Sequence, residues 1–158
     1  MYESPRVING MVVGVERAFT PAELGFDGVS VKALATVIGN KIDLQGFKDF
    51  MLTLVIDNAG GGSTGLMKIT IDLFDEQDVA ILTAFDLVTA INLKADNVYT
   101  VCFGRTNTAK QNYTSGTPVL SGSADILRIP ARMRISLTTT EVSNGTTVTA
   151  TGYLRAAA

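Results

Sequence analysis

The sequence predicts an all-β protein, an antiparallel β-sandwich or jelly roll of about eight strands with one or two short helices. Threonine occurs 19 times and shares several short runs with Val and Ile, the branched residues that fit a pleated sheet. Turn residues recur about every ten residues, as in a sandwich or barrel. A chain of 158 residues with 46% hydrophobic residues can bury one core, so a single domain over residues 1–158 is expected.

The first elements are two strands separated by a short helix. Residues 7–15 are expected to form a strand with bulges at its glycines. Residues 20–23, Thr-Pro-Ala-Glu, match a capping box with proline at the first helical position, and Gly25 limits this helix to one turn. Residues 29–38 are expected to form the second strand, which Gly39-Asn40 ends.

Two longer strands follow, over residues 47–56 and 66–74. Alternate side chains in each are apolar and are expected to face the core: Phe50, Leu52, Leu54 and Ile56 in the first, and Met67, Ile69, Ile71 and Leu73 in the second. The glycine-rich segment 60–65 between them is expected to be the tip of a hairpin. A phosphate-binding loop is rejected because no Gly-Lys-Ser/Thr follows and both flanks are strands.

The acidic run at residues 75–78 predicts a short helix over about residues 76–84. Acidic residues in a first turn complement the helix dipole, and apolar residues follow at helical spacing. A strand is the alternative, because Ile81, Thr83 and Phe85 also alternate.

The next segments are two strands and a loop. Residues 87–94 and 98–105 are expected to be strands joined by Asp96-Asn97, followed by a polar loop over residues 106–122. Residues 124–129 are expected to form a short strand that ends before a proline.

The chain closes on two clear strands. In residues 132–142, Met133, Ile135 and Leu137 point one way and polar residues the other. Asn144-Gly145 is a strong signal for a tight hairpin. Residues 146–154 return with alternating small or apolar and threonine side chains, so these two strands are expected to pair.

The chain lacks the residue types that most catalysis requires. It has no His, no Trp and one Cys, which excludes Ser-His-Asp and Cys-His catalysis, His-ligated metals, an internal disulfide and Cys-clustered metal sites. We therefore expect a protein that is not an enzyme and has no cofactor. Cys102 is expected to be reduced and buried between Val101 and Phe103.

Four acidic residues, Asp72, Asp75, Glu76 and Asp78, offer oxygen ligands for Ca²⁺ or Mg²⁺. Their spacing matches no calcium-binding loop, so a solvated helix start is favoured. The same acids offer a carboxylate pair for glycoside hydrolysis, but the aromatic residues that such a cleft needs are placed on core faces.

Charge is uneven along the chain, with acids concentrated in residues 43–96 and bases in residues 97–158. Arg128, Arg132 and Arg134 form a basic stripe. The two halves are expected to pair either between strands of one chain, which is favoured, or head to tail between copies. The net charge of -2 gives no reason to bind nucleic acid, and the apolar runs are too short to span a membrane. The first residues lack a secretory signal, so synthesis in a cytoplasm is expected.

The C-terminal part resembles small all-β virion proteins of tailed bacteriophages, of the head decoration or cement type. The similar residues are SGSADILRIP at 121–130, RMRISL at 132–137 and the threonine-rich closing strand. The resemblance implies a jelly roll or related sandwich that forms a homotrimer on the capsid surface, binds the major capsid protein and is assembled in the host cytoplasm. A tail or head-fibre subunit, or a carbohydrate-binding β-sandwich with exposed aromatics, are the alternatives.

Under this hypothesis, partner contacts are expected in three regions. Residues 1–6 would form a flexible arm that orders on a partner, so that their deletion abolishes particle binding and leaves the melting temperature nearly unchanged. The glycine-rich tip and the polar loop at 106–122 are the others. The candidate contact residues are Tyr2, Pro5, Arg6, Gly61, Gly62, Tyr113, Arg132 and Arg134.

Overall fold

The fold comes from a computed structural model that describes residues 6–8, 11–13, 16–31, 35–44, 46–58, 65–93, 95–104, 111–114, 117–120, 130–142 and 148–158. Within these ranges the chain forms strands and one helix. In chain order they are β1 (Arg6–Ile8), β2 (Met11–Val13), β3 (Glu16–Phe19), α1 (Pro21–Leu24), β4 (Val29–Ser30), β5 (Thr36–Asp43), β6 (Asp49–Asn58), β7 (Gly65–Phe74), β8 (Ala80–Asn92), β9 (Asn97–Gly104), β10 (Gln111–Thr114), β11 (Thr117–Leu120), β12 (Arg132–Val142) and β13 (Val148–Ala157).

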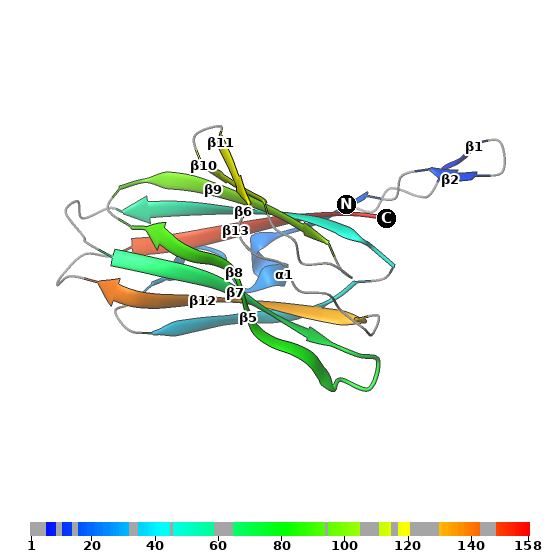
Figure 1. The fold of residues 1–158 in the computed structure, drawn as a ribbon, viewed down its shortest axis with the longest axis horizontal. Coiled ribbons are helices and arrows are strands. Elements are labelled where there is room, and N and C mark those ends of the chain that lie inside the picture. Colours follow the sequence, from blue (N-terminus) through cyan, green and yellow to red (C-terminus); the bar gives the residue numbers. More distant parts are fainter. Residues whose placement is uncertain are drawn as a thin grey trace.

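Two sheets face each other as the layers of a sandwich (Figure 1). A seven-stranded sheet has the order β11-β10-β9-β6-β13-β3, with β4 also beside β13. A four-stranded sheet has the order β5-β12-β7-β8. Helix α1 contacts β13 of one sheet and β5 of the other. The hairpin β1–β2 forms a separate two-stranded sheet.

The pairing of the main strands is that of a jelly roll. Strand β3 pairs with β13, β5 with β12, β6 with β9 and β7 with β8. Of these eight strands, the first in the chain therefore pairs with the last, the second with the second last, and so on inward. This is one long antiparallel hairpin folded over into two sheets, and contacts of β13 with β6 and of β12 with β7 complete them. The predicted all-β fold class is confirmed.

The core lies between the sheets and is built by alternation along the strands. Every second residue of β6, β7, β12 and β13 is buried, as period-2 patterning predicts. The buried residues of these four strands include Phe50, Leu52, Leu54, Ile56, Met67, Ile69, Ile71, Leu73, Met133, Ile135, Leu137, Val148, Ala150 and Leu154. The inward faces expected for these strands are therefore confirmed.

The short helix α1 forms as its sequence predicts. The Thr20 hydroxyl accepts from the N–H of Glu23 at 3.3 Å, and the Glu23 carboxylate accepts from the N–H of Thr20 at 2.7 Å. Pro21 stands in the first turn. Gly25 ends the helix in the left-handed region, with φ of 79°. Leu24 is buried, so one turn of helix closes the side of the sandwich.

The two strands expected near the N-terminus are each divided. In place of one strand over residues 7–15, β1 and β2 pair antiparallel, with Ile8 opposite Met11. The Asn-Gly between them, where a bulge was expected, lies outside the described residues. In place of one strand over residues 29–38, β4 pairs with β13 and β5 pairs with β12 in the other sheet.

Strand β5 continues through Gly39, where the sequence predicted an end. A Cβ atom at Gly39 would lie 2.6 Å from the carbonyl oxygen of Ile135 and 2.7 Å from that of Leu24. Glycine is therefore needed because β12 and the end of α1 approach the β5 backbone closely, which is a recognised use of glycine within a strand.

The helix expected over residues 76–84 is wrong, and the alternative, a strand, is correct. The carboxylate of Asp75 accepts from the N–H groups of Gln77 at 3.0 Å and Val79 at 2.9 Å, which closes a tight turn between β7 and β8. Asp78 adopts a positive φ of 66°. The acidic run is thus turn chemistry, and the alternating residues after it form β8.

Two expected hairpins are also wrong. Strands β6 and β7 lie in different sheets, and so do β12 and β13. The expected loop at residues 106–122 contains β10 and β11, which extend the larger sheet beyond β9. The strand expected at residues 124–129 and the expected turn at Asn144-Gly145 lie outside the described residues.

Candidate interaction surfaces

The residues expected to contact a partner are described to different extents. Tyr2, Pro5, Gly61 and Gly62 lie outside the described residues, while Arg6 lies in β1 and Tyr113 in β10. Arg132 and Arg134 are described with their side chains, on the outer face of the four-stranded sheet. Arg128, the third member of the predicted stripe, lies outside the described ranges.

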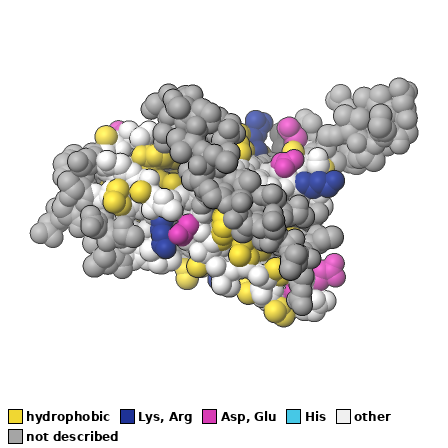
Figure 2. Space-filling model, viewed as in Figure 1, with side chains coloured by type: hydrophobic (Ala, Val, Ile, Leu, Met, Phe, Trp, Pro, Cys, Tyr) yellow, Lys and Arg dark blue, Asp and Glu magenta, His cyan; other side chains and the backbone are white. Residues whose placement is uncertain are grey.

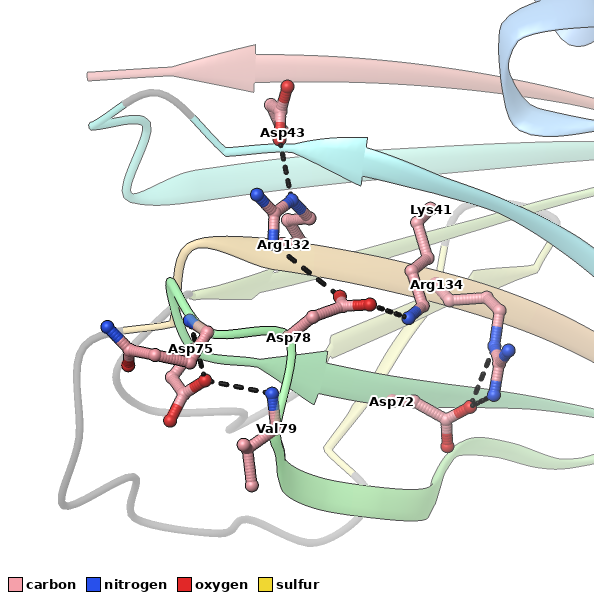
Figure 3. A network of polar contacts seen from close by, with 9 residues as sticks. Lys41, Asp43, Asp72, Asp75, Asp78, Val79, Arg132 and Arg134 are labelled. Atoms are coloured by element: carbon pink, nitrogen blue, oxygen red, sulfur yellow. Dashed lines mark hydrogen bonds and ion pairs between the residues drawn. The ribbon is translucent and has the colours of Figure 1, made fainter.

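Arg134 of β12 makes a tight ion pair across the sheet. Its Nε and NH2 atoms donate to Oδ2 of Asp72 on β7, at 3.0 and 2.7 Å (Figure 3). The other carboxylate oxygen of Asp72 accepts from the N–H of Ala84 at 2.8 Å, where the β8 backbone has a φ of 50°. The Asp72 side chain is 14% exposed. One carboxylate therefore joins β7 to both β12 and β8.

Arg132 belongs to a second, more open network. Its Nε donates to Oδ1 of Asp43 at 3.2 Å and its NH1 to Oδ1 of Asp78 at 3.5 Å, while Lys41 Nζ donates to Oδ2 of Asp78 at 2.7 Å (Figure 3). The hydrogen bond from Lys41 holds the pKa of Asp78 below its usual value, and the charges of Lys41 and Arg132 act in the same direction against desolvation. Internal pairing of the acidic and basic halves is confirmed for both arginines.

An aromatic ring lies beneath these cations. Phe74 stands opposite Arg132 in the register, on the outer face of β7, yet is 6% exposed. Lys41 Nζ lies 4.1 Å and Arg134 Cζ 5.4 Å from its ring centroid. The two cations thus shield an outward-facing aromatic side chain from water.

A shallow hollow of about 510 Å³ opens beside this network. Its lining residues are Lys41, Asp43, Glu76, Gln77, Asp78 and Arg132. Within the part of the chain that the structure describes, no group of three or more His, Cys, Asp or Glu side chains is arranged to hold a metal ion. Lys41, Asp43, Asp78 and Arg132 of the hollow form ion pairs with one another. The acidic residues 75–78 form the turn before β8 and not a solvated helix start.

The outer face of the seven-stranded sheet has a different character. The register aligns Tyr153, Thr53 and Thr100, then Thr151, Val55 and Val98, then Arg155, Met51 and Cys102. A 3.4 Å hydrogen bond joins the hydroxyls of Thr53 and Thr100 across the strands. Tyr153 is 48% and Val98 50% exposed. Two of these three rows are therefore uncharged, with valine, threonine and tyrosine side chains, and the third carries Arg155.

Cys102 belongs to this outer face and not to the core. It is half-buried between buried neighbours that point inward, so the expected burial is wrong. Alternation places Cys102 opposite in direction to Val101 and Phe103. Desolvation raises the pKa of its thiol.

The sequence did not predict the outer face of the seven-stranded sheet as a candidate interaction surface. The signal was present in β6, whose solvent-side positions include Met51, Thr53 and Val55 in place of charged residues. Its meaning depends on which strands lie beside β6, and sequence alone does not provide that.

A third surface follows the edge of the four-stranded sheet. Figure 2 shows hydrophobic side chains along the side of the sandwich where β8 lies. Val79 at the start of this edge is 54% exposed, and Ile81, Leu82 and Phe85 are half-buried. Among the described strands β8 pairs with β7 alone, and its register shifts at several points along that pairing.

The hydroxyl of Tyr99 donates to the carbonyl oxygen of Asn92 at 3.2 Å, so this ring is held by its own chain. In the described ranges, no helix has the length and apolar character required to cross a membrane.

No protein-family model and no curated protein matches the sequence. Solved structures match the fold. A structure of infectious bursal disease virus, Gx strain, covers 99% of this chain with a TM-score of 0.57 and 15% identity. The VP2 subviral particle of infectious bursal disease virus covers 98% with a TM-score of 0.57 and 12% identity. This chain spans only 36% and 37% of those viral chains.

A lectin, UEA-II complexed with galactose, matches with a TM-score of 0.41 over 82% of this chain at 10% identity. A similarity this low gives no support to sugar binding. The chain is thus a jelly-roll domain with the same fold as about a third of a particle-forming viral protein.

Proposed function

We propose that the protein is a non-enzymatic structural subunit of a virion, and specifically a capsid decoration or cement protein that binds and stabilises a lattice of the major capsid protein. The observation that carries the proposal is the jelly roll, shared along 98% of this chain with the VP2 subviral particle. The resemblance of residues 121–137 to tailed-phage head proteins supports the decoration role.

The character of the surfaces supports action through protein contacts. Most charged side chains around the hollow are paired, as Lys41 and Arg132 are with Asp78. The opposite sheet presents uncharged rows of valine, threonine and tyrosine side chains on its outer face, with Arg155 beside them. A specific contact needs roughly 1,000 Å² of buried surface, and many weak copies on a lattice add through avidity. The proposed site of action is the outer surface of the capsid, with a homotrimer as the binding unit.

Co-sedimentation tests this proposal directly. The purified protein is mixed with particles of the virus that encodes the chain, prepared without this protein, and the pellet is quantified. Saturable binding in a fixed ratio to the major capsid protein is expected. Protein that stays in the supernatant, or that binds an immobilised glycan array and is a monomer, would refute the decoration role and favour the carbohydrate-binding alternative.

A further inference from the structure

Two opposite charges on the outer face of the seven-stranded sheet have no ion-pair partner in the described part of the chain. Arg155 of β13 stands beside Met51 of β6, and Asp57 lies near the other end of β6. Both side chains are exposed. Among the described residues, neither side chain makes an ion pair or a hydrogen bond. Both charges are therefore available to a partner.

The other sheet treats its charges differently. The described cations on the outer face of the four-stranded sheet each pair with an acid of their own chain; they are Lys41, Lys68, Arg132 and Arg134. Unpaired charge is therefore a property of the seven-stranded sheet and distinguishes the two outer faces.

Arg155 and Asp57 are placed symmetrically along β6. The register puts Arg155 at the level of residue 51, so Arg155 and Asp57 lie equally far from the level of Leu54, on opposite sides of it. Consider a two-fold axis at this level, in the plane of the contact and perpendicular to the strands. Such an axis brings Arg155 of each copy next to Asp57 of the other, so that the opposite charges meet twice.

The distances allow this pairing. Neighbouring strands such as β13 and β6 lie about 4.8 Å apart, and two sheets packed face to face lie about 10 Å apart. An arginine side chain extends about 7 Å from its Cα atom, so Arg155 and Asp57 of the other copy span the gap together. Aligned packing of two twisted sheets at about 30° is the usual arrangement in β-sandwiches.

The side chains between the two charges also match. The same axis places the level of Thr53 opposite the level of Val55, so that Tyr153 lies over Val55 and Thr151 of the other copy. Val98 lies at the level of Val55 on β9. Tyr153 and Val98 are 48% and 50% exposed, and the contact would cover both. An exposed uncharged patch with a charged rim is typical of a protein interface.

The other charges of this face lie at its rim. Glu16 and Asp49 are exposed one level beyond Arg155, and the two-fold axis places them opposite the end of β6, outside the contact. Lys48 is exposed, but alternation directs it away from Asp49 and this face. At the far end, the Asp96 carboxylate already accepts from a backbone N–H of β6 at 2.8 Å. Asp57 is therefore the acid that Arg155 meets.

The face has the size of a small specific contact. The levels of residues 51 to 57 span about 20 Å along the strands, and β13, β6 and β9 with one neighbour on each side span about 24 Å. Two such faces in contact bury on the order of 1,000 Å², which is about the minimum for a specific interface.

We infer that two copies of this chain pack face to face through their seven-stranded sheets, with Arg155 of each copy paired to Asp57 of the other. The contact joins copies two by two. It is therefore additional to the contact that forms the proposed homotrimer, and it does not depend on a capsid lattice.

Light scattering of the purified protein over a series of concentrations tests the contact. Arg155→Asp and Asp57→Arg each place like charges together at both symmetric sites, so each variant should have half the mass of the wild type. An equimolar mixture of the two variants should regain the full mass, because the two chains then present opposite charges to each other at both sites.

The matched control compares two double variants of equal net charge. Arg155→Asp with Asp57→Arg in one chain should regain the full mass, whereas Arg155→Asp with Asp49→Arg should stay at half. All three positions are exposed, so thermal melts followed by circular dichroism should show every variant folded.

Three results would overturn the inference: single variants with the mass of the wild type, a mixture that stays at half the mass, or recovery by Asp49→Arg as complete as by Asp57→Arg. All measurements use purified protein without virus particles. Failure of this contact is therefore distinguishable from failure to bind a capsid lattice.

Discussion

At the residue scale, the most informative side chain is Asp72. Its Oδ2 atom accepts a hydrogen bond from NH2 of Arg134 at 2.7 Å, and its Oδ1 atom accepts one from the N–H of Ala84 at 2.8 Å. The sequence shows that Asp72 and Arg134 carry opposite charges, but it does not show that they lie opposite each other on neighbouring strands. Only the β7–β12 register brings them together.

Replacing Asp72 with alanine should destabilise the fold by about 2 kcal/mol, because a charged hydrogen bond and a backbone partner are lost while Arg134 stays partly buried. Urea unfolding followed by circular dichroism measures this loss. The matched control is Asp43→Ala, whose side chain is 61% exposed and whose loss should cost less than about 1 kcal/mol. Equal losses in the two variants would contradict this role for Asp72.

The carboxyl groups of Glu23 and Asp78 are expected to make the stability of the fold depend on pH under acidic conditions. The backbone N–H of Thr20 lowers the pKa of Glu23 from 4.5, and the hydrogen bond from Lys41 lowers the pKa of Asp78 from 3.8. Since both pKa values are lower in the folded state, the stabilisation is present above these usual values and is lost as pH falls through the folded ones.

Thermal melts between pH 6 and pH 2 should therefore show the melting temperature falling below about pH 4.5. A Glu23→Gln, Asp78→Asn double variant should show a shallower fall than the wild type. If the melting temperature of the double variant falls as steeply with pH as that of the wild type, other carboxyl groups dominate acid unfolding.

At the element scale, alternation identified the inward faces of β6, β7, β12 and β13 correctly. Pairing was predicted less well, because a jelly roll pairs strands distant in sequence, such as β3 with β13. Local turn signals therefore suggested hairpins between β6 and β7 and between β12 and β13 that the fold does not contain. The acidic run before β8 was mistaken for a helix start because its carboxylates serve a turn.

Gly39 lies in β5, where the backbones of β12 and the end of α1 come close to the strand. Gly39→Ala should cost about 2–3 kcal/mol in the free energy of unfolding, because the new Cβ would lie 2.6 Å from a backbone oxygen that cannot move independently. Gly152→Ala is the comparison, since its nearest contacts are Phe26 side-chain atoms at 3.3 Å and should cost about 1 kcal/mol. Chemical denaturation of both variants tests the order, and a smaller loss at Gly39 would contradict it.

At the scale of the whole molecule, the two sheets have unlike outer faces. The four-stranded sheet carries Arg134, Asp72 and their neighbouring ion pairs, and the seven-stranded sheet carries Tyr153, Val55 and Val98. Composition predicted a protein with unusually little charge, but could not assign the apolar surface to one face. The expected partner residues 61 and 62 and the first five residues lie outside the described ranges.

The account depends on the claim that this jelly roll works as a structural part of a virus particle. Quantitative mass spectrometry of purified virions tests that claim most directly. The protein should be present in a constant ratio to the major capsid protein across independent preparations and should remain after washing with high salt. Its absence from virions, together with its recovery as a free protein from infected cells, would contradict the proposed role.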